Sequence, residues 1–165
     1  PSASCTGFVR NNFGKIFENN AFQSPAKKVT NRMFELSEFL VKILNVTDLG
    51  AKFEGKATYH DSCAGLRECN IKQEPRTLLS KVAGLELVEM NEVETCCGFG
   101  GSFAVKYDTI SVSMADQKIE NIINTKAEYL ISTDSSCLMH LDGRMKFNGN
   151  NVQILHLADV LASGY

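Results

Sequence analysis

Residues 56–63 read KATYHDSC, a β-prone run that leads directly into a cysteine. Similar short runs recur along the second part of the chain, and the sequence predicts strands over residues 56–60, 85–90, 128–133 and 152–155. Helical stretches separate them, and this alternation is typical of a parallel β-sheet covered by helices. The sequence therefore predicts an α/β fold with a parallel β-sheet flanked by helices.

Capping residues and apolar spacing mark the helices between these strands. One helix is predicted from Pro75 to a stop at Gly84, and a long one from Asp108 or Thr109. Another is predicted over residues 138–147, closed by an Asn-Gly turn, and a short helix ends the chain. Two helices are predicted before Gly50, the second starting near Ser24-Pro25 or Thr30 and continuing to residue 44.

Four cysteines follow predicted strands. Cys63 follows the first strand, Cys96 and Cys97 follow the second, and Cys137 follows the third. Loops that leave the carboxyl ends of parallel strands converge at one edge of an open sheet, where ligands usually bind. We therefore expect these four side chains to meet in space.

Residues 96–101 read CCGFGG and favour metal chemistry. Adjacent cysteines form a disulfide with each other only at the cost of backbone strain, so a vicinal pair is better suited to directing two thiolates at one metal. The glycines, of which Gly98 directly follows the cysteine pair, can expose backbone N–H groups that hydrogen-bond to cluster sulfurs. With Cys63 and Cys137 the count reaches four thiolates, which fits a [4Fe–4S] cluster or a zinc ion.

The remaining cysteines and histidines have weaker claims to the site. Cys69 is interpreted as a buried small apolar residue, and Cys5 has no partner cysteines nearby in the sequence. His140 lies one helical turn after Cys137 and could bind the same metal or support a ligand. His60 could donate a proton or hydrogen-bond to sulfur, or it could be a structural histidine satisfied by the backbone.

Composition limits the class of protein. The chain has 165 residues with 17 basic and 19 acidic side chains, and neither a basic stretch for nucleic acid nor an apolar run long enough to span a membrane is visible. No export signal is visible, so the six cysteines point to a reducing cytosol rather than to a disulfide framework. Nucleotide-binding glycine motifs and a serine nucleophile motif are not found either.

Two segments near the start resemble two near the end. Residues 1–5 resemble residues 133–137, and residues 34–40 resemble residues 155–161, in the same order. This echo suggests a duplication. We expect residues 51–165 to form a complete repeat and residues 1–50 to be the helical second half of an earlier, truncated one.

The cysteine pattern resembles a known family. Residues 60–63 (HDSC), 96–101 (CCGFGG) and 136–139 (SCLM) are similar to the motifs of the cysteine-rich CCG domain. That domain occurs in heterodisulfide reductase and in the iron–sulfur subunits of glycolate oxidase and anaerobic glycerol-3-phosphate dehydrogenase. The chain resembles in particular the lactate utilization protein A and glycolate oxidase iron–sulfur subunit type, over nearly its whole length, and members of the family carry two tandem repeats.

The resemblance implies an iron–sulfur electron-transfer subunit of a multi-subunit complex that oxidises a small 2-hydroxy acid, L-lactate or glycolate. It implies partner subunits that are flavin-containing and ferredoxin-like, and an oxidoreductase component rather than a self-sufficient enzyme. The implied location is the cytoplasm, with any attachment to a membrane made through the partner subunits. His140 stands where the family has the last cysteine of Cys-x-x-Cys. A four-cysteine cluster or zinc is therefore expected instead of the family's double cluster, and the same change argues against heterodisulfide cleavage, which remains only as an alternative.

Two alternatives remain open from the sequence. The same four cysteines could hold zinc in a purely structural assembly module. A thiol–disulfide oxidoreductase, in which Cys96 or Cys97 attacks a substrate disulfide, is the other. An aerobically prepared protein could also have lost its cluster and have an empty site.

Overall fold

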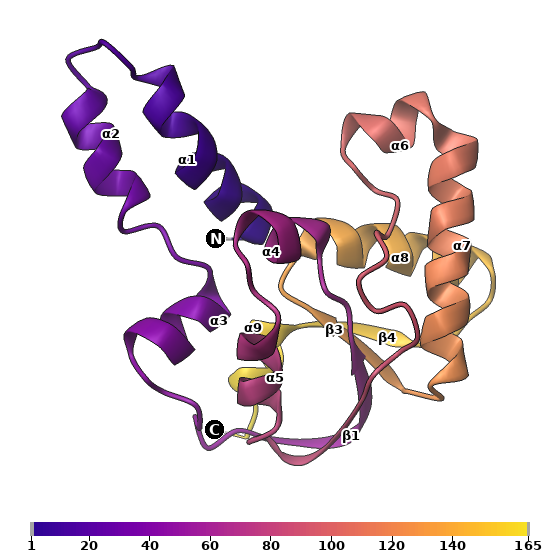
Figure 1. Cartoon of the computed structure of the whole chain (residues 1–165). Helices are drawn as coiled ribbons and strands as arrows, with labels where there is room; N and C mark the ends of the chain where they lie inside the picture. Colours follow the sequence, from indigo (N-terminus) through magenta and orange to yellow (C-terminus); the bar gives the residue numbers. More distant parts are fainter. Residues whose placement is uncertain (1, 165) are drawn as a thin grey trace.

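The computed structural model describes residues 2–164 and contains a four-stranded parallel sheet in the order β2-β1-β3-β4 (Figure 1). The strands are β1 (Lys52–Tyr59), β2 (Ala83–Val88), β3 (Tyr129–Ser132) and β4 (Gln153–His156). β1 pairs in parallel with both β2 and β3, and β3 pairs with β4. The predicted α/β class with a parallel sheet is confirmed.

Helices cover both faces of this sheet. They are α1 (Ala3–Ile16), α2 (Gln23–Thr30), α3 (Leu36–Glu38), the π-helical turn η1 (Phe39–Ile43), α4 (Cys63–Glu68), α5 (Gln73–Leu79), α6 (Ser102–Lys106), α7 (Asp108–Asn124), α8 (Ser135–Phe147) and α9 (Leu157–Leu161). α5 and α9 pack on one face of the sheet, against Ile131, and α7 and α8 pack on the other, against Leu130. Successive residues of β3 thus serve opposite faces, as strand geometry requires.

Two strands begin earlier than the sequence predicted. β1 starts at Lys52 rather than Lys56, and its pairing with β2 is irregular between Lys52 and Gly55, where Gly55 has a φ of 142°. β2 starts at Ala83, so Gly84 lies within the strand. The prediction that Gly84 ends the preceding helix is therefore wrong. α5 ends at Leu79 instead, and a short turn separates it from the strand.

The front of the chain is broken into more pieces than expected. The second predicted helix, which was to run to residue 44, ends at Thr30 and resumes at Leu36. The carboxylate of Glu35 accepts the backbone N–H of Ser37 at 2.8 Å and so starts a new helix. Arg10 fixes the intervening segment by donating its Nε to the carbonyl of Met33 at 2.7 Å.

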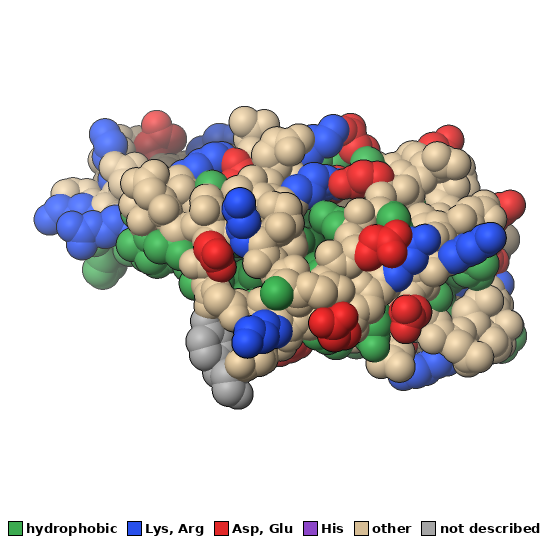
Figure 2. All heavy atoms as spheres, turned by 90° about the horizontal axis from the view of Figure 1, so that it is seen from below, with side chains coloured by type: hydrophobic (Ala, Val, Ile, Leu, Met, Phe, Trp, Pro, Cys, Tyr) green, Lys and Arg blue, Asp and Glu red, His purple; other side chains and the backbone are tan. Residues whose placement is uncertain are grey.

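The α1–α2 hairpin projects from the body of the molecule, at the upper left of Figure 1. On the face in Figure 2, acidic and basic side chains are interspersed. None of the helices within residues 2–164 is long and apolar enough to cross a bilayer.

Candidate metal centre

The site lies where the chain reverses its path across the sheet. From β1 the chain moves outward to β2 on one side and then returns to β3 on the other side of β1. Such a switch point leaves a crevice beyond the carboxyl ends of the two central strands, because their loops turn away in opposite directions. Cys63 follows β1 and Cys137 follows β3, so both lie at this crevice.

Helix starts fix the positions of these two cysteines. Ser62 accepts the N–H of Gly65 at 3.1 Å and caps α4, of which Cys63 is the first residue. Asp134 accepts the N–H of Ser136 at 3.2 Å and caps α8, which places Cys137 in its first turn. Both caps are of residue types favoured at helix starts.

The Cys96–Cys97 segment reaches the crevice from β2 through a loop. The Gly98 N–H points at the Cys96 sulfur at 3.4 Å, as expected for a glycine that supports a thiolate. Ser111 of α7 donates its hydroxyl to the Gly98 carbonyl at 2.8 Å and fixes the loop to the helix. Gly98 has a φ of 91°, and a Cβ there would lie 2.6 Å from the Ser111 carbonyl oxygen, so the close approach requires glycine.

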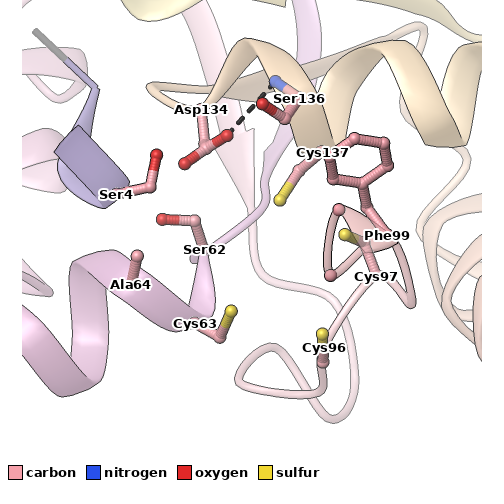
Figure 3. A pocket seen from close by; sticks show the side chains of 12 residues that line it. Ser4, Ser62, Cys63, Ala64, Cys96, Cys97, Phe99, Asp134, Ser136 and Cys137 are labelled. Atoms are coloured by element: carbon pink, nitrogen blue, oxygen red, sulfur yellow. Dashed lines mark hydrogen bonds between the residues drawn. The ribbon is translucent and has the colours of Figure 1, made fainter. Parts of the chain in front are cut away.

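The four predicted cysteines line one cavity of about 210 Å³, and Figure 3 shows their sulfurs directed toward one another from three segments of the chain. Cys97 and Cys137 are buried, whereas Cys63 and Cys96 are partly exposed. The opposite wall carries polar side chains: Ser4, Ser62, Asp134 and Ser136. All six cysteines are free thiols in the structure.

Electrostatic coupling among the thiols is strong. The pKa of Cys96 is lowered far below its usual value, mainly by a hydrogen bond from the Cys63 thiol and to a smaller extent by one from the Cys97 thiol. The pKa of Cys63 is raised, mainly by its contact with the Cys96 thiol and to a smaller extent by burial. The pKa of Cys97 is also raised, mainly by contact with the Cys137 thiol and to a smaller extent by contact with Cys96. Negative charge in the metal-free cluster thus concentrates on Cys96, and metal binding requires Cys63 and Cys97 to release protons.

His60 belongs to the same cluster. One ring nitrogen of His60 and the sulfurs of Cys97 and Cys137 lie within 4.8 Å of one another. The side chain is fully buried, and among the described residues neither ring nitrogen has a hydrogen-bond partner. The alternative of a structural histidine satisfied by the backbone is therefore wrong for the ring. Burial and, secondly, the charge of Lys118 lower the pKa of His60 to about 3, so the ring is neutral and able to bind a cation or donate to sulfur.

The other expected residues lie outside the cavity lining. Cys5 is exposed, although its neighbour Ser4 lines the cavity. Cys69 is buried and donates its thiol to the carbonyl of Ala3 at 3.3 Å, which confirms the interpretation of a buried residue. His140 contacts the edge of the site instead, with its ring 5.8 Å from that of Phe99 and its Nε2 3.4 Å from the Ser111 hydroxyl. The structure therefore places His60 beside the sulfurs of Cys97 and Cys137, whereas His140 is not part of that group.

Lys118 was missed by the sequence analysis. Its side chain is fully buried beneath the cysteine loop. A signal for it was present, because Ser111, Ala115, Lys118 and Ile122 share the buried face of α7 at helical spacing. A lysine at an apolar position of that face is unusual and indicates a specific partner.

Four free thiols and a neutral imidazole at the switch point of a parallel sheet define a cysteine-rich α/β domain with a candidate metal centre. The chain belongs to the CCG cysteine-rich domain family, whose sequence profile matches residues 57–142. It is 43 % identical over 164 residues to lactate utilization protein A of Geobacillus sp., covering 99 % of this chain and 68 % of that protein. It is also 42 % identical over 163 residues to the uncharacterized protein YkgE of Escherichia coli, with coverages of 99 % and 68 %.

A third relative is lactate utilization protein A of Oceanobacillus iheyensis, 41 % identical over 162 residues, with coverages of 98 % and 66 %. The chain thus spans about two thirds of the length of these relatives. The predicted membership in the CCG family and similarity to lactate utilization protein A are confirmed.

Proposed function

We propose that Cys63, Cys96, Cys97 and Cys137 hold a [4Fe–4S] cluster and that the chain relays electrons in a lactate-utilization system. The observation that carries this proposal is the convergence of four thiols, from three separate loops, on one cavity. Four cysteine thiolates are the usual ligand set of such a cluster. The cluster, when bound, supplies one-electron chemistry.

The residues around the cavity fit this group. An N–H donor at Gly98 points at the Cys96 sulfur, and such donors stabilise the reduced state of iron–sulfur groups. Cys97 and Cys137 belong to an apolar cluster with Met90, Ala115 and Leu138, which keeps water from that side of the site. His60 offers a neutral ring with free nitrogens as a further donor to sulfur.

Zinc is the second candidate, favoured by the His60, Cys97 and Cys137 group. Mixed nitrogen and sulfur ligands are typical of zinc, and Cys63 or Cys96 could complete a tetrahedron. In that case the domain would serve as a structural assembly module. A third candidate is thiol–disulfide exchange at Cys96, whose pKa is lowered by neighbouring thiols. Thiol–disulfide exchange activity in the metal-free protein would support it.

The names of the relatives support the biological setting. Two of them are named lactate utilization protein A, and we propose that this chain contributes to oxidation of L-lactate, or of a similar 2-hydroxy acid such as glycolate. Because the site offers thiols rather than a flavin or nicotinamide site, the substrate would be oxidised on a flavin-containing partner subunit, and ferredoxin-like subunits would carry electrons between the components. We place this assembly in the cytoplasm.

We also propose that residues 1–50 and 51–165 derive from a duplicated repeat, with residues 1–50 corresponding to the second half of the first copy. Helix caps support this. Ser2 and Asp134 cap α1 and α8 at equivalent points of the two similar segments, and Glu35 and His156 do so for α3 and α9.

The test is anaerobic reconstitution with Fe²⁺ and sulfide. We expect about four iron and four sulfide per chain, visible charge-transfer absorption and an electron paramagnetic resonance signal on reduction. Binding of about one zinc per chain with no retained iron would favour the zinc site instead. Retention of neither metal, with full thiol–disulfide activity in the metal-free protein, would contradict both metal proposals.

A further inference from the structure

Lys118 is the largest fully buried side chain of the described residues, and it is charged. Burying an ammonium group is costly unless polar or charged partners compensate for the lost water. Its Nζ donates to the backbone carbonyls of Glu92 at 3.1 Å and Val93 at 2.7 Å. These two carbonyls belong to the loop that leads from β2 to Cys96 and Cys97.

The same helix contacts that loop on both sides of the cysteine pair. Lys118 binds the loop before the pair, at residues 92 and 93, and Ser111 binds it after the pair, at the Gly98 carbonyl. Both side chains are buried and lie two turns apart on α7. The helix thus holds the Cys96–Cys97 segment between two fixed points.

The ammonium of Lys118 is in direct contact with no carboxylate of the described residues, although carboxylates act on it from further away. In the part of the chain that the structure describes, none of the ion pairs includes Lys118. The nearby buried Asp61 is bound by Arg76 through both carboxylate oxygens, at 2.9 and 2.8 Å. Burial lowers the pKa of Lys118 to about 8 and outweighs the negative groups that act on it, which are Asp61 first, then Cys97 and Cys96 in their thiolate forms, and Glu92.

We propose that Lys118 is a positioning residue for the metal centre: its ammonium anchors the cysteine loop and supplies the fixed positive charge that balances the thiolate-bound group. This inference rests on the proposed function, because it assigns a role toward the group held by the four cysteines. A positive charge near an iron–sulfur group stabilises the more negative, reduced state and raises the reduction potential.

The experiment compares Lys118→Gln with wild type after anaerobic reconstitution. Glutamine keeps an N–H donor for the carbonyls and removes the charge, while Lys118→Arg keeps the charge. Exposed Lys81 provides the matched control, because Lys81→Gln removes the same charge from a side chain that makes none of the described contacts with the cysteine loop. The readouts are iron per chain, reduction potential and circular dichroism.

We expect Lys118→Gln to shift the equilibrium between reduced and oxidised group about tenfold toward the oxidised form, which is about 59 mV to lower potential for one electron. Lys118→Arg should retain most of the wild-type potential, and Lys81→Gln all of it. If the amide variant does not fold, Lys118→Met, which has a similar length and no charge, is measured in its place.

The outcomes separate this inference from the one on which it rests. A wild-type protein that retains no metal overturns the proposed function and this inference with it. A wild-type protein that retains its cluster, together with a neutral Lys118 variant of unchanged potential and iron content, overturns this inference alone. Equal potential shifts in Lys118→Gln and Lys118→Arg would also overturn it, because they would indicate packing rather than charge.

Discussion

At the scale of single residues, the six cysteines divide by environment. Cys97 faces the cavity beside three other thiols, whereas Cys69 is buried elsewhere against Ala3. We expect Cys97→Ser to lose most of the bound metal, because a serine hydroxyl is a poor thiolate substitute. Cys69→Ser, an equally buried control, should keep it. Metal analysis of both variants after identical anaerobic reconstitution checks this, and equal losses would show that the ligands have been assigned wrongly.

Gly98 and Gly101 provide a second test at this scale. Both have positive φ, of 91° and 60°. A Cβ at Gly98 would collide with α7, whereas a Cβ at Gly101 would have no other atom within 4 Å. We expect Gly98→Ala to lower the free energy of unfolding by about 3 kcal/mol, and Gly101→Ala by about 1 kcal/mol from backbone strain alone. Urea unfolding of the metal-free variants measures both. Equal costs would mean that the loop moves away from α7 without penalty.

The four cysteines of the cavity could be predicted from the sequence, because the ends of strands are recognisable from the local pattern of residues. It could not choose between His60 and His140, because the choice depends on which side of the loop each ring occupies. His60 follows β1 and lies beside Cys97 and Cys137, whereas the ring of His140 lies 5.8 Å from that of Phe99 and outside this group. Lys118 was missed because a lysine within a helix is ordinarily solvated, and only its partners Glu92 and Val93 explain its burial.

At the scale of elements, Glu74 links α5 to η1. Its carboxylate pairs with Lys42 at 2.7 Å and accepts the N–H of Lys72 at 3.1 Å. Burial alone would raise the pKa of Glu74, but the pair with Lys42 and the backbone N–H groups outweigh it, and the pKa is lowered. A carboxylate with a lowered pKa stabilises the fold above its unfolded pKa, and this contribution is lost as the pH falls through the folded pKa.

We therefore expect Glu74→Gln to reduce the stability of the metal-free protein by about 1 kcal/mol at pH 7. The difference from wild type should disappear when the pH falls below the folded pKa of Glu74, where the wild-type side chain is also neutral. Glu86→Gln is the control, because Glu86 is exposed and lies 3.7 Å from Lys56. Unfolding curves between pH 3 and 7 check this, and a difference that persists at low pH would contradict the ionic explanation.

The elements that sequence reasoning missed are short or depend on distant contacts. α4 and α6 have six and five residues, too few for apolar periodicity to indicate them. The break between α2 and α3 depends on Glu35, a residue type that is not favoured as an N-cap, and on Arg10 from another helix. The long helix α7 and the alternation of strands and helices were predictable because their patterns extend over many residues, whereas the order of strands in the sheet was not predicted.

At the scale of the whole molecule, packing is uneven. β3 lies inside the sheet, paired on both sides, and its Leu130 and Ile131 are fully buried. The hairpin helix α2 buries a single residue, Ala26, and packs mainly against α1, while Phe22 and Val29 remain exposed. Local opening is cheapest where little apolar surface is buried. The sheet with its metal centre and the projecting hairpin should therefore differ in local stability.

We predict that amide hydrogens of α2 exchange at least about a hundredfold faster than those of β3 in the metal-free protein, a difference of roughly 3 kcal/mol in opening free energy. α8 is the control: it is helical like α2 but packs on the sheet through Leu138, Leu141 and Met145. Its amides should exchange as slowly as those of β3, since burial and not helix type sets the protection. Native-state hydrogen exchange read by mass spectrometry measures all three segments. Equal protection of α2 and β3 would mean that the hairpin unfolds together with the sheet, and that the whole chain is one cooperative unit.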